Sequence, residues 1–146
     1  MPERLKGEWK YTKALAISES DCRPKVCSSS NACGVMQILQ RTWGDISDVP
    51  YNKGIYNPAY NIEAGIAYLA SLAKQWDRRG RKPREVLDLA AASYNAGLGN
   101  ILKAQRLCGI SRLWGDIAPC LYKVTGKNNA SSTIEYIKRI NFEAGD

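Results

Sequence analysis

The chain has 146 residues, 45% of them hydrophobic, which suffices for the core of one compact domain spanning residues 1–146. It contains no histidine, which excludes Ser–His and Cys–His catalysis and every histidine-containing metal site. We therefore expect neither a metal nor a cofactor. The net charge of +7 comes from scattered basic residues without a nucleic-acid-reading motif, so nucleic acid is not an expected partner. The longest basic cluster, residues 78–82, is interpreted as a solvated loop or as a segment that attracts an anionic polymer.

Helical spacing dominates the first part of the chain, and residues 4–19 are predicted to form a helix. Five of its residues fall on one face: Leu5, Trp9, Thr12, Ala16 and Glu19. Residues 20–34 break this pattern with a proline and a run of three serines, which predicts a loop that its cysteines could cross-link. Residues 40–47 are predicted to form a short helix, and residues 48–57 a second loop.

Proline and glycine mark the ends of the next predicted helices. These helices span residues 58–78, Pro83 to Gly97, and residues 99–107. A capping box of Ser132 and Glu135 predicts the start of a last helix. Because strand signals are few, we expect a mostly α domain with at most a small β-hairpin within residues 22–56.

Five cysteines, at positions 22, 27, 33, 108 and 120, lack the spacing of a zinc site with paired CxxC motifs. Two disulfides and one free thiol would fit an oxidising compartment, and five reduced thiols a reducing one. The sequence does not distinguish the possible pairings.

Glu19 ends the first predicted helix on its apolar side. A carboxylate near a helix C-terminus feels the negative end of the helix dipole, and apolar neighbours remove water from it. Both effects raise the pKa of the carboxyl group, which suits a general acid. From its position alone, however, a half-exposed surface glutamate is the simpler interpretation.

Two further segments carry groups that suit a sugar. In the segment Gly34-Val35-Met36-Gln37, the glycine lets another group come close to the backbone, and the glutamine offers an amide donor and acceptor. The segment Ser93-Tyr94-Asn95-Ala96-Gly97 places a tyrosine hydroxyl and an asparagine amide at a helix end. Each segment alone is interpreted as an ordinary turn or helix cap.

The combination of these segments is more informative than any one of them. The pair Glu19-Ser20 and the two segments above resemble, in order and spacing, the lytic transglycosylase family related to goose-type lysozyme. Two more blocks strengthen the resemblance, the first matching N-I-x-x-G-x-x-Y-L and the second matching T-x-x-Y: Asn61, Ile62, Gly65, Tyr68 and Leu69, then Thr133 and Tyr136. The resemblance spans roughly residues 12–140 and implies a lysozyme-like α domain.

The resemblance also implies roles for individual residues. Glu19 corresponds to the family's catalytic acid/base. Six residues correspond to substrate-binding or nearby positions: Ser28, Met36, Gln37, Tyr94, Asn95 and Tyr136. The chain departs from the family pattern at Asn31-Ala32, at Cys33 directly before Gly34, and at Ser132, where an acidic residue is usual. These departures concern loop conformation and specificity, and they leave the acid in place.

The function that the resemblance implies is cleavage of the β-1,4 bond between N-acetylmuramic acid and N-acetylglucosamine in peptidoglycan. One glutamate would act as acid and then as base, leaving a 1,6-anhydro product. Two alternatives remain open: a goose-type-like hydrolase that uses water, and a non-catalytic wall-binding or virion structural module.

The expected partner is therefore the peptidoglycan glycan strand, and the expected state is a monomer that acts in the bacterial periplasm or cell wall. The sequence has no apolar run of the length that spans a membrane and no apolar core of a secretory signal near its start. These features fit a mature form, an excised domain or a protein delivered by a phage.

Overall fold

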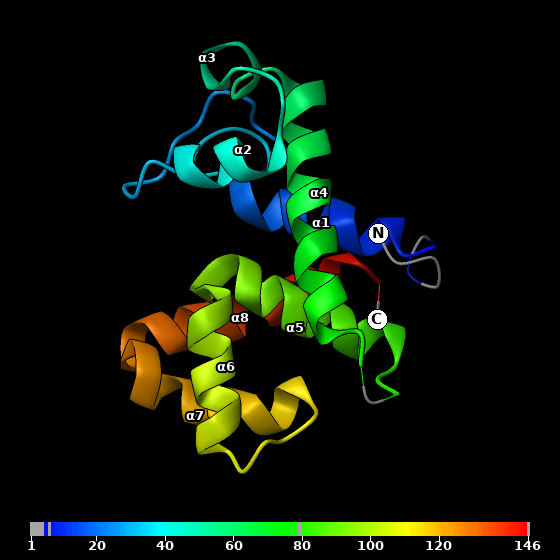
Figure 1. Cartoon of the computed structure of the whole chain (residues 1–146), viewed down its shortest axis with the longest axis vertical. Helices are drawn as coiled ribbons and strands as arrows, with labels where there is room; N and C mark the ends of the chain where they lie inside the picture. The colour runs from blue at the N-terminus through cyan, green and yellow to red at the C-terminus, as the bar shows by residue number, and fades with distance from the viewer. Residues whose placement is uncertain (1–4, 6, 79, 146) are drawn as a thin grey trace.

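The computed structural model describes residue 5, residues 7–78 and residues 80–145. In this part of the chain Figure 1 shows helices joined by short connections. They are α1 (Trp9–Ser20), α2 (Gln40–Ile46), α3 (Tyr51–Gly54), α4 (Pro58–Trp76), α5 (Pro83–Ala96), α6 (Leu98–Leu107), α7 (Trp114–Thr125) and α8 (Lys127–Glu143). The only β-type pairing among the described residues consists of isolated bridges from Cys33 to Cys27 and to Ile38. The expected fold class, mostly α with at most a small hairpin, is confirmed.

The helices form two groups connected by α4 (Figure 1). The short helices α2 and α3 lie at one end of the molecule with the loop that follows α1. The helices α5, α6, α7 and α8 pack against one another at the other end. The helix α4 contacts α2 and α3 near its start and packs against α5, while α1 packs against α8. The end of α1 therefore lies where the two groups meet.

The central helix is α5, and its sequence explains why. Seven of its residues are fully buried: Val86, Leu87, Leu89, Ala90, Ala91, Ala92 and Ser93. The three consecutive alanines let α4, α6 and α8 approach its backbone closely. Gly97, with a φ of +94°, ends the helix in a conformation that favours glycine. The predicted boundaries of this helix are thus confirmed.

The helices differ from the predicted ones at four places. The predicted loop over residues 48–57 contains the short helix α3. The helix α7 was not predicted, and it contains Pro119, which cannot donate a helical hydrogen bond. The helix α8 begins at Lys127, because Gly126 with a φ of +88° separates it from α7, so Ser132 lies inside the helix instead of capping it. The first helix begins at Trp9, so the described residues 5, 7 and 8 of the predicted helix precede α1, and its predicted start at residue 4 lies outside the described residues.

The structure resolves the cysteine pairing that the sequence left open. Cys27 is bonded to Cys33, and Cys108 to Cys120, while Cys22 is a free, exposed thiol. The first disulfide closes the loop after α1, and the second connects the end of α6 to α7. Within the described residues, no helix combines the length and the apolar character needed to cross a membrane.

Candidate active site

The carboxyl group of Glu19 lies in the last turn of α1, at the contact between α1 and α8. The hydroxyl of Tyr136 on α8 donates a hydrogen bond of 2.7 Å to Glu19 Oε1. Burial raises the pKa of Glu19 from 4.5 to about 7, although the hydrogen bond from Tyr136 lowers it. A large fraction of the molecules therefore carry a protonated Glu19 at neutral pH, as a general acid requires.

A second polar contact holds α1 in place two turns before Glu19. The hydroxyl of Tyr11 donates to Asp88 Oδ1 at 2.7 Å, and Asn141 Nδ2 donates to the same oxygen at 3.0 Å. This contact joins α1, α5 and α8. Burial raises the pKa of Asp88, and the two hydrogen bonds oppose that shift. The position of Glu19 thus depends on α1 being fixed at both contacts.

Tyr94, one of the residues expected at or near the substrate, lies near the end of α5 and close enough to Glu19 to feel its charge. Its hydroxyl donates to the backbone oxygen of Met36 at 2.6 Å, and its ring contacts that of Tyr68 at 4.9 Å between centroids. Burial raises the pKa of Tyr94 well above 10.0, and the negative charge of Glu19 raises it further. Tyr94 therefore donates its hydroxyl proton to the Met36 carbonyl and not to Glu19, but it lies close enough to Glu19 for the carboxylate charge to affect its pKa.

The segment Gly34-Val35-Met36-Gln37 follows α1 in the sequence and forms a tight turn. In space, this turn is hydrogen-bonded to both α1 and α4. Asn61 on α4 is fully buried, accepts from Met36 N at 2.7 Å and donates to two further backbone oxygens, those of Cys33 and Ile55. Ser20, next to the acid, donates to the Val35 oxygen at 2.6 Å.

Glycine is required at two positions of this packing. A Cβ on Gly34, whose φ is +84°, would overlap Asn61, and a Cβ on Gly65 would overlap Met36. Asn61 and Gly65 belong to the N-I-x-x-G-x-x-Y-L block of the sequence, which does not by itself indicate these packing roles. The signal in the sequence was an amide side chain, Asn61, on the apolar face of the predicted helix over residues 58–78.

Gln37 and Ser28, both predicted to bind substrate, use their polar groups within the loop. Gln37 Nε2 donates to the oxygens of Val26 and Gly34 at 2.8 and 3.0 Å. Ser28 Oγ accepts from the backbone nitrogens of Ser30 and Ala32, both at 3.2 Å. These contacts stabilise the loop that the Cys27–Cys33 disulfide closes, and a role in substrate binding remains a prediction for both residues.

Two adjoining hollows along α8 are lined mostly by polar residues and are here called the polar trough. The first, of about 680 Å³, is lined by Ser18 from α1, Asn95 from α5, and six residues of α8: Ser132, Glu135, Tyr136, Lys138, Arg139 and Phe142. The second, of about 450 Å³, shares Asn95 and Ser132 and includes Asn100, Asn129 and Thr133. Thr133 donates to Asn95 Oδ1 at 2.8 Å, which leaves the Asn95 amide NH₂ as a donor in the trough.

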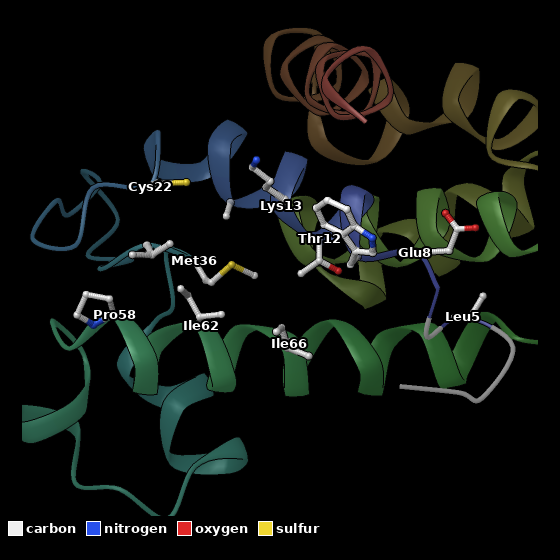
Figure 2. Close-up of a pocket in the computed structure, with 12 residues that line it drawn as sticks. Leu5, Glu8, Thr12, Lys13, Cys22, Met36, Pro58, Ile62 and Ile66 are labelled. Atoms are coloured by element: carbon white, nitrogen blue, oxygen red, sulfur yellow. The ribbon is translucent and has the colours of Figure 1, made fainter. Parts of the chain in front are cut away.

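A different, mainly apolar groove of about 490 Å³ runs between α1 and α4. Figure 2 shows Met36 extending toward Ile62 in this groove, with Ile66 further along α4. Glu19 lines neither this groove nor the polar trough, but its hydrogen-bond partner Tyr136 lines the trough. Because a saccharide needs hydrogen-bonding groups, the polar trough is the better match for a glycan, and the Met36 side chain faces the apolar groove. Among the described residues, no group of three His, Cys, Asp or Glu side chains could hold a metal ion.

The chain matches the family described as the transglycosylase SLT domain over residues 3–112. A relative from Serratia proteamaculans, named membrane-bound lytic murein transglycosylase C, is 28% identical over 139 residues. That alignment covers 88% of this chain and 39% of the relative. A protein of the same name from Actinobacillus pleuropneumoniae is 29% identical over 137 residues, covering 84% of this chain and 37% of the relative. The chain therefore spans about two fifths of the length of these relatives.

Among solved structures, the chain is similar to the 70 kDa soluble lytic transglycosylase Slt70 from Escherichia coli. The TM-score is 0.66 at 24% sequence identity, over 94% of this chain and 22% of Slt70. The complex of the 70 kDa soluble lytic transglycosylase with bulgecin A matches with a TM-score of 0.67. This similarity shows that the chain has the same fold as that part of Slt70.

Proposed function

Because the chain belongs to the transglycosylase SLT domain family, we propose that it cleaves the glycan strands of peptidoglycan as a lytic transglycosylase. The observation that carries this proposal is the half-buried Glu19, whose carboxyl pKa of about 7 provides a protonated acid at neutral pH. Tyr136, which donates a hydrogen bond to the acid, lines the polar trough, so a hollow with hydroxyl and amide groups begins at the direct partner of Glu19. The proposed place of action is the periplasm or the cell wall.

The proposed reaction has two proton transfers at the same carboxyl group. Glu19 donates its proton to the glycosidic oxygen while the bond between that oxygen and C1 of N-acetylmuramic acid breaks. The N-acetyl group of the same sugar supports the positive charge that develops at C1. The anionic Glu19 then removes the proton of the C6 hydroxyl, whose oxygen closes onto C1. This step gives a 1,6-anhydro sugar and returns Glu19 to its protonated form, so no water is consumed.

A single carboxylate is supported by what shifts the pKa of Glu19. Retaining glycosidases place a second carboxyl about 5 Å from the acid, and such a negative charge would raise the pKa by repulsion. Burial raises the pKa of Glu19 and the hydrogen bond from Tyr136 lowers it. No other carboxylate among the described residues is a cause of this pKa shift. Glu135, which also lines the trough, is exposed and pairs with Lys138 at 3.5 Å.

Product analysis on purified peptidoglycan sacculi tests this proposal. The expected soluble muropeptides are about one water lighter, by mass spectrometry, than those of a hydrolase. Glu19→Gln should lose turnover by a factor on the order of 100 to 10,000, while Glu63→Gln, at an exposed position on α4, should keep it. Hydrated products would instead identify a goose-type-like hydrolase. A folded protein that binds sacculi and releases nothing would be a wall-binding or virion structural module.

A further inference from the structure

The end of the α6–α7 pair exposes large apolar side chains that the proposed catalytic site does not use. This surface, here called the α6–α7 tip, lies at the end of the molecule opposite α2 and α3 (Figure 1). Leu107 is 58% exposed, Ile110 is 55% exposed and Leu113 is 41% exposed, and Tyr122 on α7 is also exposed. Exposed apolar groups gathered in one region of a folded protein usually mark an interaction site.

Three cations accompany these apolar groups. Lys103 and Arg106 on α6 and Lys123 on α7 line one hollow of about 350 Å³ together with Leu107 and Val124. All three cations are exposed. Within the described residues, none of them pairs with a carboxylate. The hollow therefore offers three positive charges next to an apolar side chain.

More than half of the net positive charge of the chain lies on residues 98–127. Residues 98–127 contain one acidic residue, Asp116, and five basic residues: Lys103, Arg106, Arg112, Lys123 and Lys127. Their net charge is +4, out of +7 for the chain. The disulfide between Cys108 and Cys120 joins the end of α6 to α7, which holds the apolar and the basic groups together in the folded protein.

We propose that the α6–α7 tip docks on an anionic lipid surface. Lys103, Arg106 and Lys123 would lie against the lipid phosphates, and Leu107 and Ile110 would enter the boundary of the acyl chains. Long basic side chains beside exposed leucine, isoleucine and tyrosine are typical of segments that lie in the membrane interface. An anionic wall polymer would be attracted by the same charges, but it would bury little of the apolar surface. The apolar groups therefore favour a lipid partner.

Flotation with lipid vesicles tests the charge component. The wild-type chain should float with vesicles of equal parts phosphatidylcholine and phosphatidylglycerol, and much less with phosphatidylcholine alone. The triple variant Lys103→Gln, Arg106→Gln, Lys123→Gln should bind the anionic vesicles on the order of 100-fold more weakly, because each interfacial cation contributes about 1 kcal/mol. A matched triple variant removes three cations at exposed positions outside the tip: Lys25→Gln, Arg41→Gln and Lys53→Gln. Its affinity for the anionic vesicles should fall at most a few-fold.

The apolar component needs a second variant pair, with folding checked by circular dichroism. Leu107→Ser with Ile110→Ser should weaken binding to anionic vesicles at least 10-fold, whereas Tyr56→Ser with Tyr60→Ser, exposed positions elsewhere, should not. Equal losses for the tip variants and their controls would overturn the proposal, as would a wild-type chain that ignores anionic vesicles. If the tip variants lose binding to sacculi but keep binding to vesicles, the tip serves an anionic wall polymer instead.

Discussion

The hydroxyl of Tyr136 donates a 2.7 Å hydrogen bond to the carboxyl of Glu19, 117 residues earlier in the chain. The two residues lie on α8 and α1, helices near opposite ends of the sequence that pack side by side. Tyr136 also lies beyond residues 3–112, the range that matches the family. The environment of the proposed acid therefore depends on a helix outside the matched range.

The first prediction concerns Tyr136→Phe and the pH dependence of turnover. The hydrogen bond from Tyr136 lowers the pKa of Glu19, so its removal should raise that pKa above about 7. Since the reaction starts from the protonated acid, activity is lost as the pH rises through the pKa of Glu19. The alkaline limb of the pH–rate profile should thus move to higher pH, as measured by release of soluble muropeptides. Tyr122→Phe, at an exposed position on α7, should leave the limb in place.

The second prediction concerns the stability of Glu19→Gln. The folded-state pKa of about 7 exceeds the ordinary 4.5, so ionisation of Glu19 destabilises the fold as the pH rises between these values. The neutral glutamine avoids this cost. Relative to wild type, the unfolding free energy of Glu19→Gln should improve by roughly 2–3 kcal/mol between pH 5 and pH 8. Urea denaturation at both pH values measures it, and a difference that does not change with pH would mean that the folded-state pKa of Glu19 is ordinary.

The third prediction separates the structural and substrate roles of Tyr94. Tyr94→Phe removes the donor to the Met36 carbonyl, so the unfolding free energy should fall by about 1–2 kcal/mol. Tyr68→Phe keeps the ring contact with Tyr94 and serves as the control. Urea denaturation and turnover should be measured on the same samples. If turnover falls while stability is unchanged, the hydroxyl acts on the substrate and its bond to Met36 is unimportant.

The fourth prediction concerns Asn61→Ala. The substitution leaves Met36 N–H and the Ile55 carbonyl without their buried partner, and the Cys33 carbonyl keeps only its hydrogen bond from Ile38 N. We expect a loss of roughly 3 kcal/mol or more in unfolding free energy, because each unpaired buried group costs about 1–3 kcal/mol. Thermal or urea denaturation measures this loss. Asn128→Ala, at an exposed position of α8, should change stability by less than about 1 kcal/mol. Similar values for the two variants would show that the Asn61 contacts contribute little.

Local signals in the sequence predicted much of the fold. The boundaries of α5 follow from Pro83 and Gly97, and α4 begins where Asn57 caps it and accepts a hydrogen bond from Tyr60 N. These signals act within one or two helical turns, so the sequence displays them directly. The helix α7 escaped prediction because Pro119 interrupts its pattern and its stability comes from packing on α6 and α8.

By itself, the sequence determined the helical class, the identity of the candidate acid and the absence of histidine chemistry, because composition, helical spacing and motif order are properties of the linear chain. Only the tertiary structure decided the disulfide pairing, the bond between Tyr136 and Glu19, and the place of Met36 in the apolar groove. It also raised the pKa of Glu19 to about 7. Burial depends on which helices cover a carboxyl group, and that covering is built from segments that are distant in the chain.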